Sequence, residues 1–187
     1  GYSVTVDGDR SAVGAPDALW SAVESGTVFA YLHSATTEYE RNQRLTPDDG
    51  DDGDQFGYSV AMDYPYLVIG APGDDDLGTN AGAIYVFWHT GGAWTQLVKR
   101  TASDGGAFDQ FGAAVDISGD LIVVGAPGYD GAETNMGAIY SFSRTAIIWS
   151  EDSDRPEPPT IEEDSGFGEA LALDGRRLLA GLPRAFD

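Results

Sequence analysis

The residues best suited to chemistry in this chain are acidic side chains in two short, glycine-containing stretches. Their carboxylate and amide oxygens are hard donors, and Ca²⁺ takes six to eight such ligands in flexible loops. The two stretches are therefore candidate calcium sites. Their candidate ligands are Asp74, Asp75, Asp76 and Asn80 in one stretch and Asp48, Asp52 and Asp54 in the other.

Two alternatives to metal binding remain open for these acids. The first is a solvated, solubilising surface, because the corresponding stretch further along offers only Asp130, Glu133 and Asn135. The second concerns Asp54 and Asp109, which each precede the same Gln-Phe-Gly sequence. An Asp that accepts backbone N–H bonds in a turn explains that recurrence equally well.

No constellation for catalysis is recognisable. The chain lacks cysteine, so it has neither disulfides nor thiolate metal sites. Gly-x-Ser-x-Gly, His-Glu-x-x-His and phosphate-loop motifs are absent as well. His33 and His89 fall at corresponding positions and are expected to be surface residues near turns. We therefore expect a protein that is not an enzyme.

The charge balance excludes two classes of partner. Ten Lys and Arg against 31 Asp and Glu give a net charge of −21. Such a chain repels nucleic acid and anionic membranes, and it has no apolar run of 18 residues that would favour membrane insertion. Disorder is excluded because the apolar residues are patterned and of ordinary abundance.

The acids lie within a sequence repeat that two independent glycine markers define. One glycine falls at 1, 57, 112 and 168, and the glycine of a Gly-Ala-Pro or Gly-Leu-Pro sequence falls at 14, 70, 125 and 181. We divide the chain into repeats 1–55, 56–110, 111–166 and an incomplete 167–187. A period near 50 residues is typical of propellers or arrays. The motif residues of the two central repeats are Phe56, Gly57, Gly70, Ala71, Pro72, Phe111, Gly112, Gly125, Ala126 and Pro127.

Each full repeat predicts four strands, which in the second repeat are 58–62, 66–70, 83–88 and 94–99. Short Asp-Gly-type links between the first two strands are hairpin signals. Those two strands are apolar on both faces, so we expect inner strands that are covered on each side. The fourth is polar, as expected for an outer edge. The prediction is an all-β fold of β-propeller blades with four antiparallel strands, comprising three full blades and the start of a fourth, in one partial propeller over 1–187.

The motif residues have a structural interpretation in such a fold. Glycine lets a neighbouring blade approach closely, and proline ends a strand by withholding its N–H. We expect Phe56 and Phe111 to be buried between blades and Trp88, Trp94 and Trp149 to pack in the same way. Trp20 is the aromatic residue we single out as a platform for a ligand.

Phe-Gly followed about 13 residues later by Gly-Ala-Pro resembles the FG-GAP repeat of the integrin α-subunit propeller and its microbial relatives. This resemblance implies an extracellular or cell-surface protein that serves adhesion or recognition. Several integrin blades hold calcium in a longer loop between their first two strands. The short links 63–65 and 118–120 cannot wrap such an ion, so the chain is more similar to the repeats of bacterial and algal surface proteins.

Strand direction places six loops at one end of the propeller: 16–26, 72–82, 127–137, 46–55, 102–110 and 156–166. These loops contain 18 of the 31 acids and none of the ten basic residues. We expect a protein or glycan ligand, or neighbouring copies or blades, to bind this acidic loop end.

The alternatives are the propeller portion of a secreted carbohydrate- or lipid-acting enzyme and the repeat unit of an extracellular filament. Because the fourth repeat lacks its last two strands, we expect either the same polypeptide or neighbouring copies to supply further blades, and we favour a longer chain.

Overall fold

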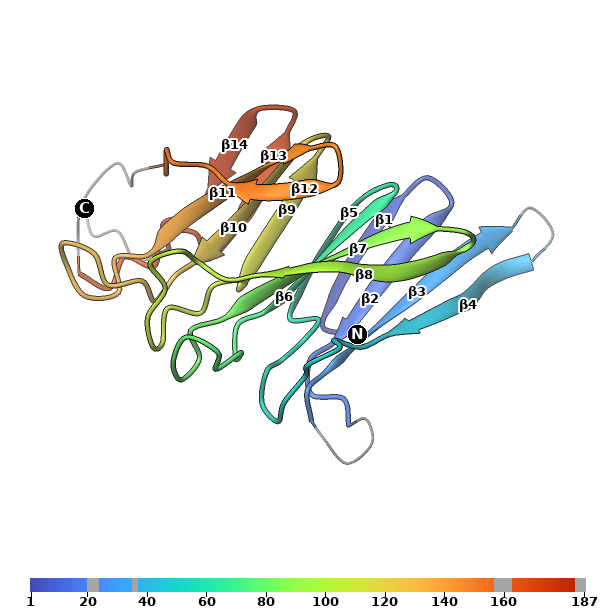
Figure 1. Cartoon of the computed structure of the whole chain (residues 1–187), viewed down its shortest axis with the longest axis horizontal. Coiled ribbons are helices and arrows are strands. Elements are labelled where there is room, and N and C mark those ends of the chain that lie inside the picture. The colour runs from blue at the N-terminus through green and yellow to red at the C-terminus, as the bar shows by residue number, and fades with distance from the viewer. Residues whose placement is uncertain (20–23, 35–36, 157–162, 184–187) are drawn as a thin grey trace.

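The computed structural model describes residues 1–19, 24–34, 37–156 and 163–183, and these contain fourteen strands (Figure 1). The described residues contain no helix, and so no helix that could cross a membrane. The strands are β1 (Ser3–Asp7), β2 (Arg10–Ala15), β3 (Thr27–Ser34), β4 (Thr37–Leu45), β5 (Ser59–Asp63), β6 (Tyr66–Ala71), β7 (Ala83–Thr90), β8 (Ala93–Arg100), β9 (Ala114–Ser118), β10 (Leu121–Ala126), β11 (Ala138–Thr145), β12 (Ile148–Glu151), β13 (Leu171–Asp174) and β14 (Arg177–Ala180).

The strands form three four-stranded antiparallel sheets and one hairpin, each in simple chain order. The first strands of successive sheets contact one another, β1 with β5, β5 with β9, and β9 with β13. The sheets therefore radiate from these inner strands and follow one another in Figure 1. This is the arrangement of propeller blades, and it confirms the predicted fold.

The predicted strands agree with the structure apart from their ends. The third strand of the second blade is longer than expected, since β7 continues to Thr90 rather than ending at Trp88. β5 begins at Ser59, one residue later than expected. The predicted hairpins are confirmed, because Asp7 pairs with Arg10 and Asp63 with Tyr66 across two-residue turns.

Phenylalanines at the start of the repeats hold neighbouring blades together. Phe56 and Phe111 are both fully buried, as predicted. The ring of Phe56 lies edge-on to Tyr85 at 5.2 Å between centroids, and Phe111 lies edge-on to Tyr140 at the same distance. Burial of each ring contributes about 1.5–3 kcal/mol, which accounts for its recurrence.

The paired glycines of the motif allow the blades to approach one another. A Cβ atom on Gly70 would lie 2.0 Å from the carbonyl oxygen of Gly112, and one on Gly125 would lie 1.9 Å from that of Gly168. No side chain fits at either position. Gly57 and Gly112 adopt φ angles of 93° and 92°, which favour glycine. The structural interpretation of the motif is therefore supported at each of these junctions.

Tryptophans also pack between blades. Trp149 is fully buried and lies edge-on to Tyr66 of the preceding blade at 5.5 Å, and Trp94 is 5% exposed. Trp88 is half-buried against the same core as Trp149. Trp20 lies outside the described residues.

The expectation that the first two strands are covered on both faces is wrong for β1 and for the hairpin β13–β14. Val4 and Val6 are 72% and 65% exposed, and Leu179 is 76% exposed. The counterparts of Val4 and Val6 in the second blade are Val60 and Met62. Both are buried in a cluster that includes Ala12 and Phe56 of the preceding junction. Burial of these positions thus requires an adjacent blade, which the local sequence pattern does not reveal.

Candidate binding face at the loop end of the blades

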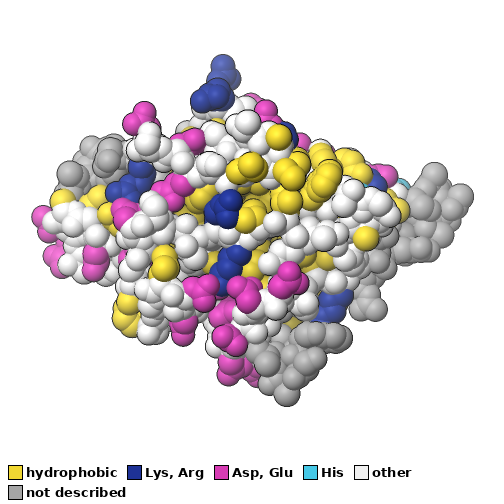
Figure 2. Space-filling model, in the orientation of Figure 1, with side chains coloured by type: hydrophobic (Ala, Val, Ile, Leu, Met, Phe, Trp, Pro, Cys, Tyr) yellow, Lys and Arg dark blue, Asp and Glu magenta, His cyan; other side chains and the backbone are white. Residues whose placement is uncertain are grey.

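Loops from neighbouring blades are joined by backbone hydrogen bonds at one end of the propeller. The N–H of Gly73 donates to the carbonyl of Asp54, and that of Gly128 donates to Asp109. The N–H of Phe108 donates to the carbonyl of Thr79 at 2.7 Å. Figure 2 shows acidic side chains gathered toward the lower left of the view, where Figure 1 places these loops. The predicted grouping of loops at one acidic end is therefore present in the described residues, while 20–23 and 157–162 of the predicted loops lie outside them.

Three carboxylates of this loop end surround one lysine. Lys99 on β8 places its Nζ atom 2.7 Å from Asp74, 2.7 Å from Asp76 and 3.0 Å from Asp49. The hydroxyl of Tyr85 donates to Asp49 and Asp74 at 3.0 and 3.2 Å. Burial by itself would lower the pKa of Lys99, but its hydrogen bonds to Asp74, Asp76 and Asp49 outweigh burial and raise it. An ammonium group therefore occupies the centre of this cluster, which we call the Lys99 cluster.

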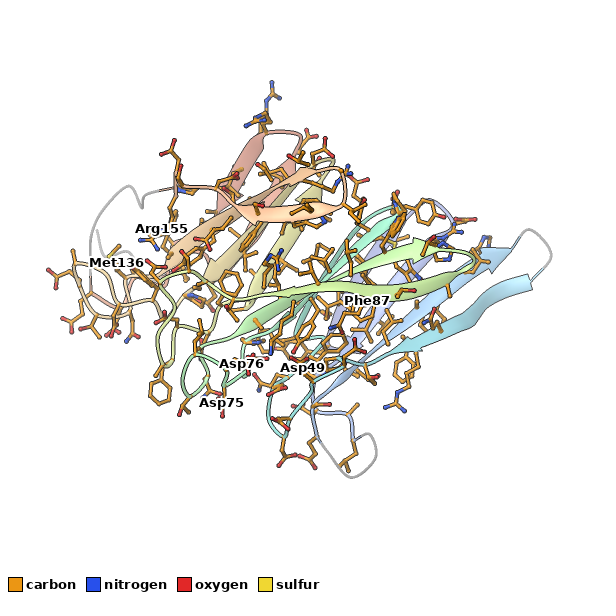
Figure 3. All side chains as sticks on the ribbon, viewed as in Figure 1. Asp49, Asp75, Asp76, Phe87, Met136 and Arg155 are labelled. Atoms are coloured by element: carbon orange, nitrogen blue, oxygen red, sulfur yellow. The ribbon has the colours of Figure 1, made fainter. Side chains whose placement is uncertain are left out.

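The seven candidate calcium ligands do not meet at one point. Asp74 and Asp76 meet at Lys99, together with Asp49, and Figure 3 labels Asp49, Asp75 and Asp76 at this loop end. Asp75 instead accepts the backbone N–H of Asn80 at 2.6 Å.

The acids of the earlier stretch are divided in the same way. The carboxylate of Asp52 accepts the N–H of Glu24 at 2.9 Å, and the backbone N–H of Asp48 donates to Gln96. Among the described residues, no group of three or more His, Asp or Glu side chains is arranged to hold a metal ion. Calcium binding by the seven residues stays a prediction.

Asp54 and Asp109 have the turn role that was the alternative to metal binding. The carboxylate of Asp54 accepts the N–H of Asp51 at 2.7 Å, and that of Asp109 accepts the N–H of Gly106 at 2.7 Å. Both side chains are buried. Burial, together with the nearby charges of Asp74 and Asp51, raises the pKa of Asp54 to about 6. Burial likewise raises the pKa of Asp109.

A second cluster occupies the equivalent position one blade further on. The guanidinium of Arg155 donates to Asp104 at 3.0 Å and lies over the rings of Tyr129 and Tyr140, at 4.5 and 5.1 Å from their centroids. The hydroxyls of both tyrosines donate to Asp104. Burial would raise the pKa of Asp104, but the hydrogen bond from Tyr140 and the charge of Arg155 outweigh it and lower that pKa. We call this group the Arg155 cluster.

Sequence reasoning missed these two clusters because their cations lie outside the loops. Lys99 and Arg155 reach back over the acidic end and neutralise part of it. The signal that could have found them is the shared spacing of 55 residues between Asp49 and Asp104 and between Tyr85 and Tyr140.

Two hollows open beside these clusters. One, of about 690 Å³, is bounded by polar side chains that include Ser103, Glu151 and Asp154. The other, of about 340 Å³, is lined by side chains that include Tyr58, Phe108 and Glu169. His89 is not part of either hollow, and its Nδ1 atom lies 3.1 Å from the hydroxyl of Tyr64.

Comparisons with known proteins agree with the repeat. A model of the FG-GAP repeat matches residues 39–87 and 94–142, together more than half of the chain. No curated protein matches the sequence. Among solved structures, a europium-containing methanol dehydrogenase superposes with a TM-score of 0.45 at 13% identity, over 74% of this chain and 22% of that protein. The chain thus spans about a fifth of that protein's length. From the family match and the Phe-Gly and Gly-Ala-Pro positions between the blades, the chain belongs to the FG-GAP repeat family.

Proposed function

We propose that this chain is a non-enzymatic recognition segment of an extracellular or cell-surface propeller and that it binds its ligand at the loop end. The observation that supports this most directly is the bonding of neighbouring loops to one another. Gly73 and Gly128 donate to the carbonyls of Asp54 and Asp109 across blade junctions. Loops held in this way are pre-organised, which lowers the entropic cost of binding.

The non-enzymatic part of the proposal is supported by how the carboxylates of the two clusters and of the Asp54 turn are engaged. Asp74 is paired with Lys99, Asp104 with Arg155, and Asp54 with a backbone N–H. None of these pairs is a nucleophile with its base. A carboxylate fixed by a full set of partners serves structure more readily than proton transfer.

The electrostatics of the loop end favour neutral or cationic ligands. Several loop acids are exposed and have no side-chain hydrogen bond among the described residues, including Asp48, Asp51, Glu133 and Glu163. Their summed field repels anionic surfaces and attracts cationic ones over about 8–10 Å at physiological salt. Adhesion to a neutral or basic extracellular polymer fits this surface.

Binding of the whole chain to immobilised extracellular polymers tests the proposal. The panel comprises collagen, fibronectin, cellulose, chitin and mannan, measured by biolayer interferometry. We expect at least one polymer to bind with a Kd in the micromolar range. Neutralising the loop end with Glu133→Gln/Glu163→Gln or Asp48→Asn/Asp51→Asn should weaken the binding of a protein polymer about tenfold.

The matched control, Asp120→Asn/Asp174→Asn, removes two charges from the turns at the opposite end and should change binding less than twofold. Binding to none of the polymers, or equal losses in the loop and turn variants, would overturn the proposal. Release of soluble sugars or peptides from a bound polymer would overturn its non-enzymatic part.

A further inference from the structure

The smaller hollow, of about 340 Å³, lies where the starts of the inner strands meet at the loop end. Tyr58, Ala113 and Glu169 line it, and each directly follows the Phe-Gly pair of its own repeat. Phe108, Gln110 and Asn135 also line it from the loops, together with Pro127, Gly128 and Gly166. Its size is within the range of pockets that bind small ligands. It is distinct from the Lys99 and Arg155 clusters, with which it shares no residue.

This cavity exists because the third repeat departs from the first two. The counterparts of Ala113 are Tyr2 and Tyr58, whose rings pack at 4.8 Å between centroids. A hydrogen bond with Tyr2, together with burial, raises the pKa of Tyr58 to about 12. The tyrosine pair thus fills its own junction, and the methyl group of Ala113 leaves the next junction open.

A second departure gives the cavity an aromatic wall. Phe108 has a φ of 70°, and the same position is Gly53, with a φ of 93°, in one neighbouring repeat and Asp164, with a φ of 57°, in the other. A bulky residue in this left-handed conformation is strained. Phe108 is nevertheless 57% exposed, so burial of its ring does not offset the backbone strain. Strained, exposed aromatic residues of this kind are typical of ligand contacts.

The polar groups of the cavity are available for hydrogen bonding. Gln110 and Glu169 are exposed, and neither side chain has a hydrogen-bond partner among the described residues. The amide of Asn135 is held by Asp164 at 2.8 Å. The cavity therefore offers a free amide and one free carboxylate beside an aromatic ring.

We propose that this cavity binds a neutral sugar residue of an extracellular glycan, an inference that rests on the proposed function. The apolar C–H face of a pyranose stacks on an aromatic ring, and its hydroxyls bond to amide and carboxylate groups. The acids around the cavity disfavour uronates, sulfated sugars and phosphates. A cationic side chain can also lie over the exposed ring of Phe108, so hexalysine serves as the competing ligand in the test.

Titration of the whole chain with neutral oligosaccharides tests the inference, with cellohexaose, chitohexaose, mannohexaose and galactotetraose as probes in calorimetry. We expect at least one to bind with a Kd below about 1 mM. Ala113→Tyr restores the residue of the first two repeats and should weaken that binding at least tenfold. The matched control, Ile147→Tyr, adds a tyrosine at an exposed turn outside the cavity and should leave it unchanged.

Phe108→Gly provides a second, independent variant. Glycine is the natural residue at the equivalent position 53 and tolerates the positive φ, so the Tm should rise while sugar binding falls at least fivefold. This result separates loss of a contact from loss of folding, and it stands even if Ala113→Tyr does not fold.

Three outcomes would overturn the inference: no oligosaccharide binds, both variants bind sugar as the unaltered chain does, or hexalysine alone binds and is blocked by Ala113→Tyr. Binding of collagen or fibronectin that persists without any sugar binding would refute the inference and leave the proposed function intact. If the chain binds none of the polymers, both the inference and the proposed function are refuted.

Discussion

Two clusters of side chains occupy equivalent positions in the second and third blades, one around Lys99 and the other around Arg155. In both, a tyrosine on the third strand donates to an Asp from the preceding loop, Tyr85 to Asp49 and Tyr140 to Asp104. The remaining partners differ, because Asp74 and Asp76 in the second blade correspond to Tyr129 and Gly131 in the third. The Lys99 cluster is therefore built from charges, and the Arg155 cluster from rings stacked on a guanidinium.

The difference shows which parts of the repeat are constrained. The backbone bonds, the glycine pairs and the buried phenylalanines are the same at both junctions, because the packing of blade on blade requires them. The side chains that cover the loop end are free to change, provided that each buried polar group keeps a partner. The cavity beside Ala113 lies in this variable layer.

The largest expected effects test the part that the two junctions share. Phe56→Ala and Phe111→Ala should each lower the free energy of unfolding by about 4 kcal/mol, because each removes a fully buried ring and leaves a cavity. Urea denaturation measures both. Phe108→Ala, at an exposed ring, should change stability by less than about 1 kcal/mol. A difference of more than about 2 kcal/mol between the two buried positions would show that the junctions are not equivalent.

A smaller effect should distinguish the two cations. Lys99→Met leaves the buried carboxylate of Asp74, which is 2% exposed, without its counter-charge, and should cost about 3 kcal/mol. Arg155→Met breaks a pair in which the side chain of Asp104 is 45% exposed, and should cost about 1 kcal/mol or less.

The matched control for this pair of variants is Lys99→Met/Asp74→Asn. It removes the buried charge while retaining a hydrogen-bonding side chain, and it should recover a substantial part of the loss. Urea denaturation measures the loss of unfolding free energy in Lys99→Met and in Arg155→Met. Equal losses would mean that the burial of Asp74 does not make the Lys99 pair more important for stability.

The smallest expected effect is a pH dependence that differs between the two turn aspartates. The folded chain holds the pKa of Asp54 at about 6, above its ordinary value of 3.8, so between those values the folded state binds more protons than the unfolded state. The contribution of Asp54 to the free energy of unfolding therefore falls as pH rises from about 4 to 6. Summed over that range, the fall is at most about 3 kcal/mol. Asp54→Asn should flatten that slope, stabilising the chain by about 1–2 kcal/mol at pH 7 and leaving it unchanged near pH 4.

Asp109→Asn should act in the same direction, because burial also raises the pKa of Asp109. Its effect should be smaller, and Asp48→Asn, at an exposed side chain, should leave the slope unchanged. Thermal unfolding followed at several pH values between 4 and 7 compares the three variants. If stability still falls with pH to the same extent in Asp54→Asn, the pH dependence comes from other groups.

The repeat, the order of the strands and the burial of the recurring phenylalanines could be predicted from the amino-acid sequence alone. Gly70 and Gly112 recur because backbones touch there, and Phe56 and Phe111 recur because the same gap must be filled in every blade. Hairpin links such as 63–65 are local, so turn chemistry alone predicts them. These features depend on short-range sequence patterns that recur in each repeat.

Which side chains meet at the loop end could not be predicted from the sequence, because it depends on how the blades pack. Lys99 reaches Asp49, 50 residues earlier, and Arg155 reaches Asp104, 51 residues earlier, because stacked blades bring separate loops within one side-chain length. The open space beside Ala113 likewise depends on Tyr58 and Glu169 of the neighbouring blades. Contacts of this kind depend on the angle and spacing between blades. A periodic sequence pattern does not specify that geometry.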